Sequence, residues 1–196
     1  MVKRRTRRQS PDWDELYRTA AAQAGLFTLG QAEACGYSPQ NLQKHLASKR
    51  IARLRRGIYR LAHFPAGEHE ELVAIWLWSD RHGVFSHETS LALHDLGDAL
   101  PAMLHLTVPE AWRARRLRVP DGVLLHYADL PHQSRTWFDV VPVTTPPQVL
   151  AECIDVHVSP ELVEQAIRQA RQRGLISGTN ATDLGRRLRK SLTGPA

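Results

Sequence analysis

The segment from Ser38 to Arg60 constrains the fold of this chain more than any other. Ser38-Pro39 supplies an N-cap and a first-turn proline for a helix over about 39–48, in which two leucines four residues apart share one face. Two short apolar runs then flank Arg56-Gly57, and this pattern predicts a β-hairpin that carries several arginines. A helix followed directly by such a hairpin is the outline of a winged helix-turn-helix.

The residues before this segment supply the other helices of such a module. Apolar residues at helical spacing predict a helix from Pro11-Asp12 to about Ala24. Thr28 followed three residues later by Gln31 is a capping-box pattern, which predicts a second helix over about 29–35. Gly36 can adopt the positive φ that closes the short turn between this helix and the next.

Positive charge is concentrated in the first third of the chain. Residues 1–63 hold 13 Lys and Arg against 4 Asp and Glu, so their formal charge is 13 − 4 = +9, whereas the whole chain carries +6. The remaining residues therefore carry 6 − 9 = −3. Because cationic side chains placed against duplex DNA release condensed counterions, a module of this charge favours double-stranded DNA as its partner.

The expected DNA contacts come from the predicted third helix, the hairpin and the N-terminal arm. Glutamine, asparagine and lysine on the exposed faces of the helix can read base edges in a major groove. Arginines on the hairpin can hold phosphates or probe a minor groove. The expected DNA-binding residues are Gln40, Asn41, Gln43, Lys44, Arg53, Arg55, Arg56, Arg60, Arg4 and Arg5.

The second part of the chain alternates apolar helices with strands. We expect helices over 68–78, 86–96, 147–156, 160–173 and 181–191, and strands over 104–108, 122–128 and 138–143, the last two as neighbours in a small sheet. The fold class is therefore α+β, a winged helix-turn-helix followed by a partner domain with a smaller sheet. The expected parts are a disordered basic arm (1–11), the DNA-binding domain (12–66), the α+β partner domain (67–178) and a basic C-terminal helix and tail (179–196).

In this order, four segments resemble a known family. They are Gly25-Leu-Phe-Thr-Leu-Gly-Gln-Ala32, Leu54-Arg-Arg-Gly-Ile-Tyr-Arg-Leu61, Phe85-Ser-His-Glu-Thr-Ser-Leu-Ala-Leu-His-Asp-Leu96 and Val143-Thr-Thr-Pro-Pro-Gln-Val-Leu150. Together they resemble the AbiEi antitoxins of type IV toxin-antitoxin systems, which are winged-helix transcriptional regulators of phage-defence operons. The resemblance implies an N-terminal domain that binds operator repeats in its own promoter and represses it. It also implies that the partner domain (67–178) is antitoxin-like or effector-like and opposes a nucleotidyltransferase-type toxin.

Catalytic and metal chemistry receive little support from residue spacing. The ten histidines include no His-x-x-x-His pair, so we expect structural histidines, no metal site, no cofactor and no catalytic residues. A divalent-metal nuclease needs clustered carboxylates with a nearby lysine, and the C-terminal half has no lysine before Lys190. That nuclease stays a weaker alternative, beside a toxin-neutralising interaction protein without operator-specific DNA binding.

We expect a cytoplasmic protein. The basic N-terminus lacks the apolar stretch of a secretory signal, and no apolar run approaches the roughly 18 residues of a membrane span. The two cysteines, Cys35 and Cys153, both fall in apolar helical patterns and are expected to be reduced and buried.

Overall fold

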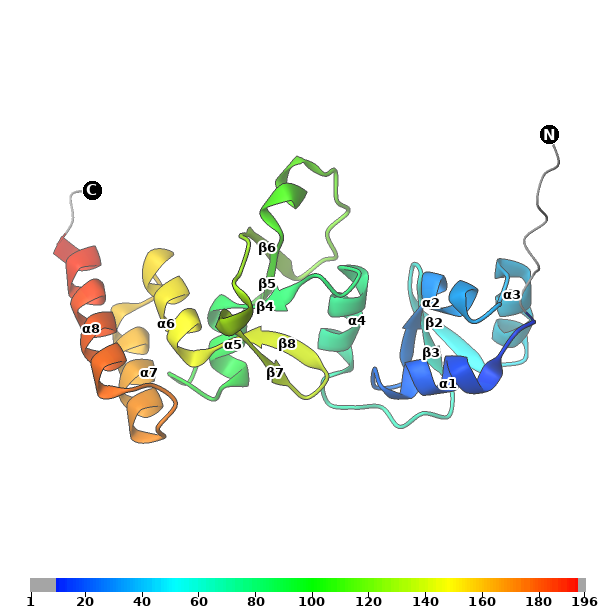
Figure 1. The fold of residues 1–196 in the computed structure, drawn as a ribbon, viewed down its shortest axis with the longest axis horizontal. Helices are drawn as coiled ribbons and strands as arrows, with labels where there is room; N and C mark the ends of the chain where they lie inside the picture. The colour runs from blue at the N-terminus through cyan, green and yellow to red at the C-terminus, as the bar shows by residue number, and fades with distance from the viewer. Residues whose placement is uncertain (1–9, 194–196) are drawn as a thin grey trace. The chain divides into compact units, whose positions relative to one another are not determined.

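The computed structural model describes residues 10–193, and contacts divide the chain into two units, 1–81 and 82–196. The sequence places the end of the N-terminal domain near Pro65-Gly67. The structure instead assigns α4 (Glu70–Trp78) to the first unit, because this helix packs on strands β1 and β3 of that unit. The α+β class and the N-terminal winged helix-turn-helix are confirmed (Figure 1).

The N-terminal unit consists of four helices and a small antiparallel sheet. Its elements are α1 (Trp13–Ala21), β1 (Leu26–Thr28), α2 (Leu29–Ala34), α3 (Pro39–Ala47), β2 (Ile51–Arg55), β3 (Ile58–Leu61) and α4. The strand order is β1-β3-β2. Leu16, Phe27, Leu42 and Tyr59 lie in one buried core between the helices and one face of the sheet. The predicted first helix is shorter than expected, since it ends at Ala21, and the three residues of β1 were not predicted as a strand.

The C-terminal unit is built on a mixed five-stranded sheet. Its strands are β4 (Val84–Phe85), β5 (Leu104–Val108), β6 (Val123–Tyr127), β7 (Arg135–Phe138) and β8 (Val141–Thr144), in the order β6-β5-β4-β8-β7. This sheet is the larger of the two. The predicted strand over 138–143 was wrong, because the chain turns at Asp139, which has a φ of +50°, and forms a hairpin. The predicted adjacency of that strand to 122–128 was also wrong, since β5 and β4 lie between them.

Helices cover the C-terminal end of this unit. α5 (His87–Leu93) follows β4 directly, and α6 (Pro146–Asp155), α7 (Pro160–Gln172) and α8 (Gly178–Thr193) pack against one another (Figure 1). Two short 3₁₀ helices, Glu110–Ala114 and His132–Ser134, complete the elements of the described range. The helices enclose an apolar core that includes Leu96, Leu150 and the buried free thiol of Cys153. Within residues 10–193, no helix is long and apolar enough to cross a bilayer.

Candidate nucleic-acid interface

Local capping interactions fix the two helices of the helix-turn-helix. The Thr28 hydroxyl accepts from the backbone N–H of Gln31 at 3.1 Å, and the Gln31 side chain accepts from the N–H of Thr28 at 2.9 Å, which closes the predicted capping box of α2. Gly36 has a φ of +85° in the turn. The Ser38 hydroxyl then accepts from the N–H of Asn41 at 3.2 Å and begins α3.

One face of α3 packs in the core of the unit, and the other faces carry polar side chains. Leu42 is buried in the core of the unit, and it is the fully buried residue of this helix. Three of the four predicted groove-reading side chains, Gln40, Gln43 and Lys44, are exposed, and Asn41 is half-buried. The exposed residues belong to the first two turns of the helix, where side chains of recognition helices reach base edges.

Aromatic contacts hold α3 against α1. The imidazole of His45 stacks on Trp13, with ring centroids 5.3 Å apart, and meets Tyr37 edge-on at 5.4 Å. Burial, and after it the charge of Arg50, lowers the pKa of His45 below its ordinary value. A neutral, packed histidine therefore fixes the inner side of the helix, and its polar outer residues keep a defined orientation.

The wing is the hairpin of β2 and β3. Gly57, at a φ of +77°, closes its turn, and the register shifts between Arg53 and Arg55, as a β-bulge does when it re-aims side chains on an edge strand. Arg53 and Arg56 are exposed. Their guanidinium groups are therefore accessible at the edge and tip of the wing, where a phosphate backbone can reach them.

Two of the predicted wing arginines lie against acidic groups of α4. Arg60 is on the middle strand, and its Nε lies 3.1 Å from Oε2 of Glu70 while its Nη2 donates to the carbonyl of Phe64 at 3.0 Å. Arg55 Nη2 lies 3.1 Å from Oε1 of Glu71, in a more exposed pair. Arg60 is thus a structural residue of this unit, unlike the exposed Arg53 and Arg56. Arg4 and Arg5 lie outside the described residues.

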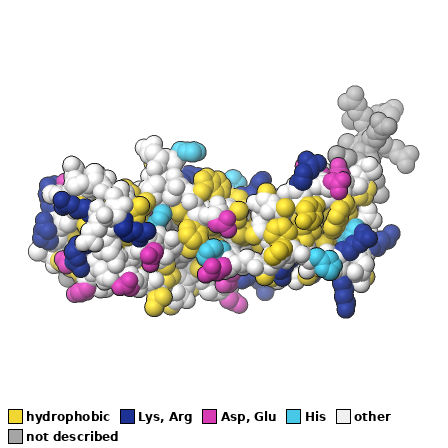
Figure 2. Space-filling view, turned by 90° about the horizontal axis from the view of Figure 1, so that it is seen from below, with side chains coloured by type: hydrophobic (Ala, Val, Ile, Leu, Met, Phe, Trp, Pro, Cys, Tyr) yellow, Lys and Arg dark blue, Asp and Glu magenta, His cyan; other side chains and the backbone are white. Residues whose placement is uncertain are grey.

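Lys49 and Arg50 were missed by the sequence analysis. Both are exposed in the short connection between α3 and β2, so they join the helix to the wing. Between residues 34 and 67 the chain has seven Lys and Arg and no Asp or Glu, which is the signal that could have found them. Lys and Arg side chains project from the surface of this unit, on the right in Figure 2.

The positive charge of this surface comes from residues 34–67. Its basic residues come from α3, the connection and the wing, and two of them, Arg55 and Arg60, pair with Glu71 and Glu70. Lys44, Lys49, Arg50, Arg53 and Arg56 keep their charge exposed. A surface of this kind offers several phosphate contacts beside amide side chains that can pair with bases.

Residues 14–62 match the family model described as transcriptional regulator, AbiEi antitoxin. The match confirms the resemblance over the helix-turn-helix and the wing. No curated protein matches the chain. Among solved structures, the chain is similar to the RV2827C protein from Mycobacterium tuberculosis, at 14% identity and a TM-score of 0.40, over 92% of this chain and 83% of that one.

Proposed function

We propose that this chain is a transcriptional autorepressor that binds operator DNA and serves as the antitoxin of a type IV toxin-antitoxin system in the cytoplasm. The observation that carries the DNA-binding part is the exposed polar face of α3 beside the exposed arginines of the wing. Support also comes from the family match over these same elements, whose description names both regulator and antitoxin.

The mechanism is occupancy of the operator rather than catalysis. α3 enters a major groove, where Gln40 and Gln43 read base edges. Lys49, Arg50, Arg53 and Arg56 hold the flanking phosphates and supply affinity that does not depend on sequence. Polymerase is excluded while the protein is bound. The C-terminal unit, 82–196, is the part to which we assign the neutralisation of a nucleotidyltransferase-type toxin.

Arg53→Ala and Arg56→Ala are expected to weaken binding to every duplex and to flatten its salt dependence. Each lost phosphate contact lowers the magnitude of the slope of log K against log salt by about 0.9. Gel shifts at four or more salt concentrations measure this slope. The control is Arg186→Ala, which removes one exposed arginine from α8. If the Arg53 and Arg56 variants keep the wild-type slope, the wing does not contact phosphates, and the toxin-neutralising protein without operator binding becomes the better reading.

Gln40→Ala and Gln43→Ala are expected to change which operator is preferred. A bidentate amide–adenine pair contributes about 1–3 kcal/mol of discrimination against a wrong base. Selection from a random duplex library should therefore show relaxed preference at one or two base pairs, while the salt slope stays at its wild-type value. An unchanged selected sequence in both variants would show that α3 does not read bases.

A further inference from the structure

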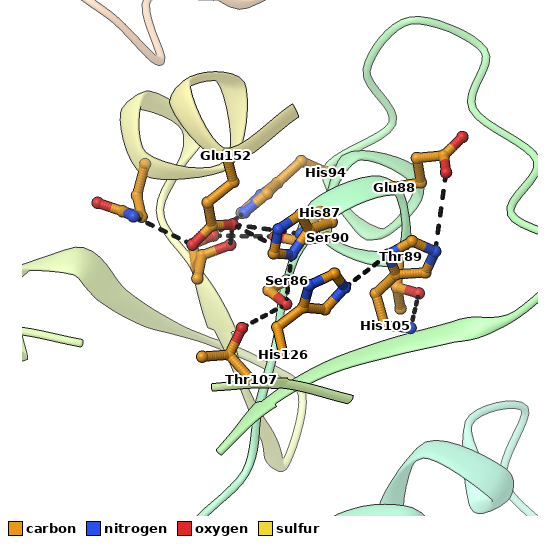
Figure 3. A network of polar contacts seen from close by, with 12 residues as sticks. Ser86, His87, Glu88, Thr89, Ser90, His94, His105, Thr107, His126 and Glu152 are labelled. Carbon is orange, nitrogen blue, oxygen red and sulfur yellow. Dashed lines mark hydrogen bonds and ion pairs between the residues drawn. The ribbon is translucent and has the colours of Figure 1, made fainter. Parts of the chain in front are cut away.

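Three histidines from separate elements meet in the C-terminal unit. His87 begins α5, His105 lies on β5 and His126 lies on β6, and their available ligand nitrogens all lie within 4.8 Å of one another (Figure 3). β5 and β6 pair in parallel, with His126 opposite Thr107. Because side chains alternate along a strand, His105 and His126 project from the same face of the sheet.

The nitrogens of two of the three histidines already have the spacing of metal ligands. The ring of His87 has to turn out of its stack on His126 to join them, because the lone pair of an imidazole nitrogen lies in the plane of the ring. His126 Nε2 lies 3.1 Å from His105 Nδ1, and the rings of His87 and His126 stack at 3.6 Å between centroids. Two imidazole nitrogens about 2.0–2.1 Å from a tetrahedral Zn²⁺ lie about 3.3 Å apart. The nitrogens of His105 and His126 already have this spacing.

Other polar groups orient the imidazoles. Glu88 Oε2 lies 3.7 Å from His105 Nε2, a carboxylate–histidine pairing that leaves Nδ1 directed at His126. His87 Nδ1 lies 2.9 Å from the Ser86 hydroxyl, which leaves its Nε2 for another partner. Partners of this kind on the far nitrogen are typical of metal-binding histidines, because they fix the tautomer and the direction of the ring.

His87 is held in a backbone conformation that a β-branched or large residue rarely adopts. Its φ is +51° at the first position of α5, and its N–H donates to the buried carboxylate of Glu152 at 3.2 Å. Such conformations cost about 1–3 kcal/mol and concentrate at functional sites. The imidazole of His87 lies face to face with that of His126.

Burial lowers the pKa of each of the three imidazoles. Burial, and after it the neighbouring His126 and His105, lowers the pKa of His87 to about 3. Burial, and after it His105, lowers the pKa of His126 to about 4. Burial also lowers the pKa of His105, against the charge of Glu88.

A cavity of about 430 Å³ opens beside two of the three histidines. It is lined by His87, His126, Glu152, Gln148 and Arg113, among others. Catalytic metal sites combine three protein ligands with a fourth position open to water or a substrate group. The cavity supplies that open side, and it also gives an ion a route to the cluster.

We propose that His87, His105 and His126 together bind one divalent transition-metal ion of the Zn²⁺ class, with a fourth ligand drawn from the adjoining cavity. Imidazole donors suit Zn²⁺, Co²⁺ and related ions and disfavour Mg²⁺ or Ca²⁺. Spacing in the sequence predicted structural histidines, because the three residues converge only when β5, β6 and α5 are assembled.

The test uses the untagged full-length chain, stripped with a chelator and titrated with Zn²⁺ and, separately, with Co²⁺. We expect one Zn²⁺ per chain by calorimetry, a rise in the melting temperature with added Zn²⁺, and the visible absorption of four-coordinate Co²⁺. His105→Gln and His126→Gln should each weaken Zn²⁺ binding by roughly 100-fold, because each removes a ligand. Loss of a group that only orients a ligand already lowers metal affinity by about 10–100-fold. His132→Gln, which changes an exposed histidine outside the cluster, is the matched control.

A different reading of the cluster is a simple histidine–histidine hydrogen bond between His126 and His105. It predicts no bound Zn²⁺ beyond weak surface association, an octahedral Co²⁺ spectrum and the same affinity in all three variants, and any of these results overturns the proposal. If a cluster variant does not fold, NMR of the wild-type chain decides. Zn²⁺ must then shift the ring resonances of His87, His105 and His126 together, and unchanged ring resonances reject the site.

Discussion

Phe27→Ala is expected to lower the free energy of unfolding of the N-terminal unit by about 3–5 kcal/mol. Phe27 is fully buried on β1, and its ring stacks on Tyr59 of the wing with centroids 5.7 Å apart. The substitution removes this ring from the centre of the core that holds α1, α3 and the sheet together. Because small domains have only about 5–15 kcal/mol of stability in total, the loss takes a large share of it.

Urea unfolding followed by far-UV circular dichroism measures the effect, and Tyr17→Ala is the control. Tyr17 is an aromatic residue of α1 with 47% of its surface exposed, so its truncation should cost less than about 1 kcal/mol. Equal destabilisation by the two substitutions would contradict the packing described for β1. The Phe27 variant should also lose DNA binding to all sequences, since it removes the fold that presents α3. Arg53→Ala should instead keep weaker binding with a flatter dependence on salt.

The helix-turn-helix could be predicted because its signals are local. The capping box at Thr28, the turn at Gly36 and the N-cap at Ser38 are each formed within a few residues, and the structure contains all three. β1 has no such signal. Its three residues become a strand only through pairing with β3, where Phe27 lies opposite Tyr59. A strand of this length has too few residues for alternation to be recognised.

The ion pairs of Arg55 and Arg60 show a second limit of what can be predicted from the sequence. Both arginines look like the other wing residues when read along the chain. Only the packing of α4 against β3 brings Glu70 and Glu71 to them. The division of the wing arginines into exposed and ion-paired groups therefore depends on a helix that the sequence analysis placed in the other domain.

The C-terminal unit was harder to predict because its sheet is formed by distant segments. β4 is two residues long and pairs with β5 on one side and with β8 on the other. The order β6-β5-β4-β8-β7 cannot be read from neighbouring strands in the sequence. The histidine cluster depends on the same assembly, and for that reason no spacing motif in the sequence predicts it.

Gly97→Ala is expected to destabilise the C-terminal unit by about 3 kcal/mol. Gly97 follows α5 at a φ of +71°, and a Cβ built there would lie 2.9 Å from the carbonyl oxygen of Leu162 and 3.2 Å from the Cβ of Ala166, both on α7. Its own N–H donates to the Gln169 side chain at 2.6 Å. Left-handed backbone costs a non-glycine residue about 1–2 kcal/mol, and overpacking against a helix adds about 1–3 kcal/mol.

Gly122→Ala separates these two contributions. Gly122 has nearly the same φ, +77°, but a Cβ there meets nothing within 4 Å, so only the backbone cost of about 1–2 kcal/mol remains. Chemical denaturation of both variants, beside wild type, measures the difference, which should be at least about 1 kcal/mol. Equal losses of unfolding free energy at the two positions would show that α7 shifts to accommodate the extra methyl group. Because Gly97 lies outside the N-terminal unit, the same variant should keep the salt slope of DNA binding, since the phosphate contacts proposed for Arg53 and Arg56 do not depend on the packing of α7.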